Sequence, residues 1–349
     1  MSLSRVRPGT SHHFDPRHAV LCGVYAMPNS SPNSHPVTDF ARWTHPASIL
    51  VATDLSDLDR LMPFAFEQAS EAGARLILLH VLASAAVMST DAAGMPYYDP
   101  AGVLEFAARA LEPWCALAQK QNIACDALVR EGNPARQIEA AIRQFPVDRV
   151  LLGTRSRSRL GKLLLGSVAE QVLRSVNLPV LTVGPEAHLP VECEGRERVV
   201  LHATTLREAS RPSAALACQI AASQGAKLVL LTVLPPMDEM ERKGLPTGLD
   251  SVAMRELRIL AEETGKGRSI AVVPRVVHGN PSIEILAEAA ELCAQLIVLG
   301  ATERSGFENL TRDRTIYRVL AHARCTVLTL RAAQADPPAA EAESLAIHL

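Results

Sequence analysis

The sequence contains an internal repeat, and no other feature constrains its fold as strongly. Three short landmarks of the first half recur in the second half: Gly132-Asn133-Pro134 as Gly279-Asn280-Pro281, Gly153 as Gly300, and Val180-Leu181-Thr182 as Val327-Leu328-Thr329. Each landmark is displaced by 147 positions and keeps its place in the order of the expected elements. Chance recurrence of common residues does not explain three landmarks at one spacing. We therefore predict two copies of one structural unit.

The beginnings of the two copies can also be aligned. Leu50-Val51-Ala52-Thr53-Asp54 matches Val200-Leu201-His202-Ala203-Thr204, and Leu79-His80-Val81 matches Leu231-Thr232-Val233. On this alignment Thr204 replaces Asp54.

The chain of 349 residues is long enough for two domains. We predict domains at 47–185 and 196–332, joined by a linker at 186–195. Residues 1–46 are rich in Ser, Pro, His and Asn, so they bury too little apolar surface to offset the entropy of ordering. This composition predicts a disordered leader, and the Pro- and Glu-containing segment 333–349 is a similar tail.

Short apolar runs alternate with helical segments inside each copy. In the first copy, strands are expected at 49–52, 76–82, 125–130, 149–152 and 180–183, and helices at 58–72, 101–121, 134–144 and 167–176. Gly73 is a typical residue at a helix end, Asn133 is a typical N-cap, and Pro113 should kink or interrupt the second helix. The alternation predicts an α/β fold of two tandem, doubly wound domains, each with a five-stranded parallel sheet.

The composition excludes several classes of function. The net charge of −2 and the aromatic content of 4% argue against a nucleic-acid-binding surface. The chain contains no apolar run long enough for a membrane span. Its seven cysteines are scattered without Cys-x-x-Cys spacing, so neither a disulfide framework nor a zinc site is indicated. We therefore expect a cytoplasmic protein.

Two loops should meet beyond the carboxyl ends of the strands, where open parallel sheets bind ligands. One is Asp54-Leu55-Ser56, and the other runs from Gly153 to Ser167 with four cationic residues: Arg155, Arg157, Arg159 and Lys162. Glycines, cations and a helix N-terminus together indicate a phosphate site. Ser167 and Glu170 have the spacing of a capping box. The alternative is a solvated loop with Ser167 only as a helix cap.

The same residues resemble the universal stress protein family in its tandem form, from 47 to 332. Nucleotide-binding members carry Gly-x-x-Gly, nine residues, and then Gly-Ser. Here Gly153 and Gly166-Ser167 fit this frame, whereas Ser156 stands at the second glycine. The segments 52–56 and 167–180 are also similar to the family. The resemblance implies a Rossmann-like, adenine-nucleotide alpha-hydrolase-like fold and a stress-response or signalling role.

The resemblance also implies that the first domain binds ATP or another adenine nucleotide, with or without Mg²⁺. Asp54 and Val81 would contact the adenosine part, and Gly153, Arg155, Ser156, Gly166 and Ser167 would hold the phosphates. The complete expected set is Ala52, Thr53, Asp54, Leu55, Ser56, Val81, Leu152, Gly153, Thr154, Arg155, Ser156, Arg157, Gly166, Ser167 and Val168.

The second copy departs from this pattern. Glu303 follows Gly300 closely, and Asp313-Arg314 occupies the Gly-Ser position. Carboxylates repel phosphate, so we expect no ATP in this copy.

No catalytic set of residues emerges, and the family implies at most slow ATP hydrolysis. His80 and His202 lie inside expected strands, where a structural role is favoured. One alternative is a module that binds no nucleotide and serves interaction and dimerisation. Segments 180–183 and 327–330 would be sheet edges that pair domain with domain and form a homodimer. A weaker alternative is a nucleotidyl-transfer enzyme on the same scaffold. Segment 83–99 is long for a loop and is either a lid over the adenine or a surface loop.

Overall fold

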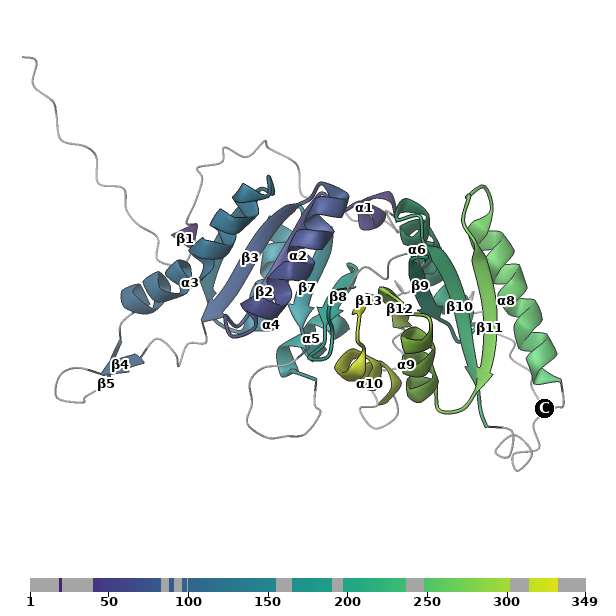
Figure 1. Ribbon diagram of the computed structural model, residues 1–349. Helices are drawn as coiled ribbons and strands as arrows, with labels where there is room; N and C mark the ends of the chain where they lie inside the picture. The colour runs from purple at the N-terminus through teal and green to yellow at the C-terminus, as the bar shows by residue number, and fades with distance from the viewer. Residues whose placement is uncertain are drawn as a thin grey trace, which may run out of the picture.

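The computed structural model describes residues 19–20, 40–82, 88–90, 96–98, 100–154, 165–189, 197–236, 248–301 and 314–331. These residues form two α/β units that lie side by side, the first coloured purple to teal and the second green to yellow (Figure 1). None of the helices in the described ranges combines the length and apolar character of a membrane span.

The two units have the same order of elements. The first contains β2 (Ser48–Thr53), α2 (Leu58–Ala72), β3 (Arg75–Leu82), α3 (Pro100–Lys120), β6 (Cys125–Glu131), α4 (Pro134–Gln144), β7 (Arg149–Gly153), α5 (Ser167–Ser175) and β8 (Val180–Val183). The second contains β9 (Val199–Ala203), α6 (Arg211–Ser223), β10 (Lys227–Leu234), α8 (Leu249–Gly265), β11 (Val272–His278), α9 (Pro281–Glu291), β12 (Leu296–Ala301), α10 (Arg314–His322) and β13 (Thr326–Arg331).

Short elements accompany them: β1 (Ala19–Val20), α1 (Phe40–Thr44), the antiparallel hairpin of β4 (Met88–Thr90) and β5 (Pro96–Tyr98), and the 3₁₀ turn η2 (Glu208–Ser210). Helices α2, α3, α6 and α8 cover one face of the sheet, and α4, α5, α9 and α10 cover the other. The doubly wound α/β architecture is therefore confirmed.

Local sequence signals account for the helix ends. The side chain of Asn133 accepts a hydrogen bond from the amide of Arg136 at 3.1 Å, and Asn280 accepts one from the amide of Ser282 at 3.1 Å. Gly73 ends α2 in the left-handed conformation, with φ 66°. Both predicted signals in the first unit, Asn133 and Gly73, are confirmed.

Helix α3 differs from the prediction because it continues through Pro113. The buried residues Ala107, Leu111, Cys115 and Ala118 lie on both sides of the proline and pack into one core cluster. This packing holds the two halves of α3 in one helix although a proline removes a backbone hydrogen bond. The predicted interruption is therefore wrong, whereas the predicted kink at Pro113 stays a prediction.

The strands of both units belong to one 11-stranded sheet in the order β1-β6-β3-β2-β7-β8-β13-β12-β9-β10-β11. Strands of one unit are parallel, apart from β1, whereas β8 and β13 pair antiparallel and join the units. Thr182 adds a side-chain bond by donating from Oγ1 to the carbonyl of Val327 at 3.0 Å. The predicted pairing of domain with domain is thus confirmed.

The same pairing corrects one expectation about these strands. Strand β8 lies between β7 and β13, and β13 lies between β8 and β12, so neither is a sheet edge. Their backbone groups are already paired within one chain. A homodimer through segments 180–183 and 327–330 would have to displace this pairing.

The sheet register also corrects the alignment of the first strands. Leu50 lies opposite Val150, and Leu201 lies opposite Ile297, so Leu50 and Leu201 are equivalent. The counterpart of Asp54 is therefore Thr205, not Thr204. The first strands of both units are mostly apolar, so an alignment shifted by one residue still matches apolar residues with one another. The hydrogen-bonded pairing with the neighbouring strand fixes the correct alignment.

The predicted disordered leader is wrong for its last residues. Phe40–Thr44 form α1, whose Phe40 and Trp43 pack against the core. The carbonyl of Trp43 also accepts a hydrogen bond from Arg149 at 2.7 Å. Strand β1 pairs with β6. The remainder of the leader, the tail at 333–349 and linker residues 190–195 lie outside the described residues.

His202 is a buried histidine at a position where the first unit has a valine. Its equivalent, by strand register, is Val51. The ring is fully buried and its Nδ1 lies 3.0 Å from the carbonyl oxygen of Val298. Burial lowers the pKa of His202 to about 4.

We expect His202 to make the second unit sensitive to acid. Its ordinary pKa is 6.5, so between pH 6.5 and about 4 the unfolded chain binds a proton that the folded chain does not. The free energy of unfolding should fall as the pH falls through this window, by up to about 1.4 kcal/mol per pH unit. Urea titrations at several pH values should show a shallower dependence for His202→Val. An unchanged slope in this variant would contradict the assignment.

Candidate functional site

A cleft opens at the carboxyl ends of β2 and β7, where the strand order of the first unit reverses. Its volume is about 220 Å³. Residues from three strands and the starts of two helices line it: Ala52, Thr53, Asp54, Asp57, Leu79, Val81, Pro134, Ile138, Leu152, Gly153, Gly166, Ser167, Val168 and Ala169.

One wall of the cleft is apolar. Leu79, Leu152 and Ile138 are buried, and Val81 packs against them while remaining partly exposed. Pro134 adds a rigid apolar surface at the start of α4. This wall suits a flat apolar ring system, because contact removes apolar surface of both partners from water.

A tight turn after β2 presents the carboxylate of Asp54 at the rim. Asp54 Oδ1 accepts hydrogen bonds from the amide of Ser56 at 2.9 Å and from its hydroxyl at 2.7 Å. Thr53 Oγ1 accepts a bond from the amide of Leu55, whose φ of 69° is left-handed. Leu55 packs against the core instead of lining the cleft. Ser56 therefore positions Asp54, an exposed residue whose carboxylate can accept further hydrogen bonds from hydroxyl donors.

A second carboxylate, that of Asp57, lies behind Gly153. The hydroxyl of Thr53 donates to Asp57 Oδ1 at 2.7 Å, and Arg60 lies 3.8 Å from Oδ2. A Cβ at position 153 would lie 2.5 Å from Asp57 Oδ2, so the glycine admits this close approach. Burial raises the pKa of Asp57, against the opposing effect of the hydrogen bond from Thr53.

The N-terminus of α5 faces the cleft without a side-chain cap. Gly166 is the N-cap residue and Ser167 is the first helical residue, so the predicted capping box of Ser167 and Glu170 is wrong. Gly166 cannot cap the helix because it has no side chain. Its amide donates to the carbonyl of Thr154 at 2.9 Å, which brings together the two ends of the loop 155–164. In the described part of the chain no side chain caps the first amides of α5, which suits the binding of an anion.

The structure brings nine of the fifteen predicted site residues into the cleft: Ala52, Thr53, Asp54, Val81, Leu152, Gly153, Gly166, Ser167 and Val168. Leu55, Ser56 and Thr154 support its rim, and Thr154 is buried. Arg155, Ser156 and Arg157 lie outside the described residues. Sequence reasoning missed Asp57, Leu79, Pro134, Ile138 and Ala169 as lining residues. For Pro134 the available signal was the Gly132-Asn133-Pro134 sequence that directly follows β6.

Comparison with known proteins identifies the family. The model of the Universal stress protein family matches residues 47–184 and again residues 197–331. The chain belongs to the universal stress protein family. Because both units match, it is a tandem universal stress protein. This membership agrees with the expectation of at most slow ATP hydrolysis.

Related proteins cover one unit or both. A universal stress protein of Mycolicibacterium smegmatis is 28% identical over 302 residues, which cover 81% of this chain and 96% of the relative. A Thermus aquaticus universal stress protein is 32% identical over 139 residues, or 39% of this chain and 97% of the relative. The crystal structure of an Archaeoglobus fulgidus universal stress protein has a TM-score of 0.59 at 20% identity, covering 82% of this chain and 99% of that one, and supports the fold.

His80 has a structural role in this universal stress protein. Its Nδ1 lies 2.9 Å from the carbonyl oxygen of Thr53, and burial lowers its pKa. In the second unit the hydroxyl of Thr232 donates to the equivalent carbonyl, that of Thr204, at 2.8 Å. A histidine and a threonine thus satisfy the same carbonyl in the two units. In the described ranges, His, Cys, Asp and Glu form no group of three that could hold a metal ion.

The second unit differs at the equivalent edge. Thr205 stands in place of Asp54, and its Oγ1 lies 3.2 Å from Oγ of Ser210. The missing side chain of Gly300 leaves room for the hydroxyl of Ser213, as the missing side chain of Gly153 leaves room for the carboxylate of Asp57. Glu303 and Asp313 lie outside the described residues, so the absence of ATP from this unit stays a prediction. The lid hypothesis also stays a prediction, because segment 83–99 is described only as the hairpin of β4 and β5.

We expect replacement of the buried carboxylate to stabilise the first unit. Because the pKa of Asp57 is raised in the folded state, ionisation costs stability, and this cost grows as the pH rises above 3.8. Asp57→Asn retains an acceptor for Thr53 Oγ1 and removes the charge. Its melting temperature should exceed that of the wild type at pH 7, and the gain should shrink as the pH falls towards 4.

Asp59→Asn is the matched control, because Asp59 is an exposed acidic residue in the first turn of the same helix. It should lower stability slightly through the helix dipole. A melting temperature of Asp57→Asn equal to or below that of the wild type at pH 7 would contradict the electrostatic argument.

Proposed function

We propose that the first unit binds an adenine nucleotide, with ATP as the principal ligand, and that the protein acts in stress response or signalling through this binding. The observation that carries the proposal is the meeting of an apolar wall, a rim carboxylate and an uncapped helix N-terminus in one cleft. These features match the base, the sugar and the phosphates of a nucleotide, respectively.

The apolar wall supports the placement of the adenine. Leu79, Val81, Leu152 and Ile138 come from β3, β7 and α4 and offer a surface without buried charges. Asp54 at the rim would accept hydrogen bonds from ribose hydroxyls. The residues present therefore fit the adenosine part of the ligand.

The start of α5 supports the placement of the phosphates. Gly166 brings no side chain over the free amides, and Ser167 contributes a hydroxyl at the same edge. Segment 155–164 contains the four cationic residues and lies in the sequence between the lining residues Gly153 and Gly166. Positive charge and aligned amides favour a polyphosphate. ATP could bring Mg²⁺ with it, since phosphate oxygens are ligands of that ion.

A module without nucleotide is the second candidate. The pairing of β8 with β13 favours this candidate, because in it the last strand of each unit binds another unit of the same fold. We also propose a cytoplasmic location, as the scattered cysteines of the sequence predict. The nucleotide experiment below discriminates the two candidates.

Two measurements test the proposal. The first is calorimetric titration with ATP, once in the presence of Mg²⁺ and once in the presence of a chelator. The second is mass spectrometry of the molecules that the denatured protein releases. The wild type should bind ATP with one site per chain. Gly166→Asp should lower ATP affinity at least tenfold, about 1.4 kcal/mol, because a carboxylate then caps α5 and repels the phosphates. The affinity for adenosine should change less than twofold, since adenosine carries no phosphate.

Asn280→Asp is the matched control, since it places a carboxylate at a helix N-cap of the second unit. It should leave ATP binding unchanged. A wild type that neither carries nor binds an adenine nucleotide would overturn the proposal in favour of the interaction module. Full ATP affinity in Gly166→Asp would overturn the placement of the phosphates at α5.

A further inference from the structure

A second cavity lies between the two units, at the opposite edge of the sheet from the nucleotide cleft. Its volume is about 240 Å³. It is lined by Thr44, His45, Gln68, Glu71, Ala72, Arg149, Leu181, Arg198, Ile220, Ser223, Gln224, Leu296 and Leu328. Arg149 and Leu296 are the first residues of β7 and β12, so this is the amino-terminal edge of the strands.

The cavity has an apolar floor and polar walls. Leu181 and Leu328, which pair across the two units, form the floor together with Leu296. Helix α2 contributes Gln68 and Glu71 to one wall, and α6 contributes Ile220 and Ser223 to the other. The site therefore offers an apolar surface and charged groups to one small molecule.

Among the described residues, no carboxylate forms an ion pair with Arg149. The side chain is buried, with 5% of the residue exposed. Its Nη1 donates to Gln68 Oε1 at 2.5 Å and its Nη2 donates to the carbonyl of Trp43 at 2.7 Å, and both acceptors are neutral. Within the described part of the chain, Nε is buried without a hydrogen-bond partner. Burial lowers the pKa of Arg149 to about 10, so the group is charged at neutral pH.

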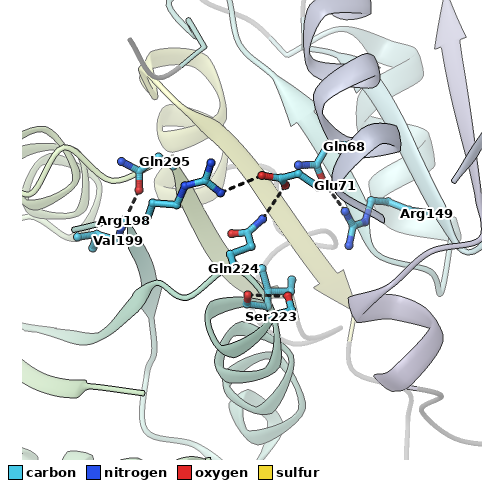
Figure 2. Close-up of polar contacts among 9 residues, drawn as sticks. Gln68, Glu71, Arg149, Arg198, Val199, Ser223, Gln224 and Gln295 are labelled. Carbon is cyan, nitrogen blue, oxygen red and sulfur yellow. Dashed lines mark hydrogen bonds and ion pairs between the residues drawn. The ribbon is translucent and has the colours of Figure 1, made fainter. Parts of the chain in front are cut away.

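The neighbouring carboxylates are engaged elsewhere. Glu71 accepts from Arg198 Nη1 at 2.9 Å and from Gln224 Nε2 at 3.0 Å, whereas Arg149 is bonded to Gln68 (Figure 2). Asp148 accepts from the amides of Ala47 and Ser48 and pairs with Arg42 at 2.5 Å. Both carboxylates lower the cost of the buried charge, but neither contacts it.

The fold itself does not require an arginine at this position. Arg149 lies opposite Ile49 in the sheet, and the equivalent residue Leu296 lies opposite Val200. The second unit thus builds the same strand with leucine. A buried charge without an ion pair is costly, so its presence beside an open cavity points to a ligand.

We propose that the cavity between the two units binds a small organic carboxylate with a compact apolar body, with the carboxylate on Arg149 and the body on Leu181, Leu328 and Leu296. A guanidinium binds a carboxylate with two parallel hydrogen bonds. Because Arg198 pairs with Glu71, Arg149 is left as one uncompensated positive charge in the lining, which matches a singly charged carboxylate better than a doubly charged phosphate. The apolar floor accommodates a branched alkyl or phenyl group.

Ligand-observed NMR and calorimetry with isovalerate and benzoate test the proposal, with isovaleramide and inorganic phosphate as comparison probes. Isovalerate or benzoate should bind the full-length protein at least tenfold more tightly than isovaleramide, which has the same body without the charge. Phosphate should bind more weakly than either carboxylate. Glu71→Gln should strengthen carboxylate binding several-fold, because it removes the repelling charge and retains an acceptor for Gln224.

Arg149→Leu should lower carboxylate affinity at least tenfold, and the leucine at position 296 indicates that the strand tolerates it. Arg130→Leu is the matched control: Arg130 is also buried and bonded to neutral groups, but its guanidinium lies over the ring of Phe145 and does not line the cavity. It should leave carboxylate affinity unchanged.

Three results would overturn the proposal: no carboxylate binding to the wild type at millimolar concentration, equal binding of isovalerate and isovaleramide, or tighter binding of phosphate. If Arg149→Leu does not fold, the comparison of isovalerate with isovaleramide and the Glu71→Gln variant decide the question. ATP binding at the other edge of the sheet is measured separately, so neither proposal depends on the other.

Discussion

The antiparallel pairing of β8 and β13 is the interaction on which the rest of the structure depends. It is short, with three residue pairs, yet Leu181 and Leu328 at its centre are each only 1% exposed. Without it, β8 of the first unit and β13 of the second would each present unpaired backbone groups to water. With it, two parallel sheets become one, and the amino-terminal edges of β7 and β12 come to face a common cavity.

Equivalent positions in the two units have diverged while the backbone has been kept. Thr53 and Thr204 each accept a hydrogen bond from a leucine amide in a left-handed turn, so the turn after the first strand is the same in both units. The residues placed on this shared framework differ: Asp54 corresponds to Thr205, Val51 to His202 and Arg149 to Leu296. The first unit therefore carries Asp54 at the rim of its cleft, and the second carries the buried His202. Arg149 lies at the cavity between the two units.

Much of the fold could be predicted because its signals are local. Apolar runs of strand length, the Asn-Pro helix starts and Gly73 each act within one or two turns of chain, and strand 180–183 was placed at its observed bounds. The predictions that failed concern residues whose structure depends on contacts with other segments of the chain. Pro113 is held in a helix by core packing, and residues 40–44 contact the core. The N-cap of α5 is Gly166, whose amide bonds to the carbonyl of Thr154, and not Ser167.

The sequence by itself determined the duplication, the α/β class, the family resemblance and nine residues of the cleft, because these follow from periodicity and from motifs close together in the chain. Only the tertiary structure decided that β8 and β13 are internal strands of one continuous sheet, that Leu50 matches Leu201, and that Asp57 lies behind Gly153. It alone placed Arg149 beside residues of the second unit. The physical reason is that these contacts join segments far apart in the chain, and composition carries no information on which of several apolar or charged segments will meet.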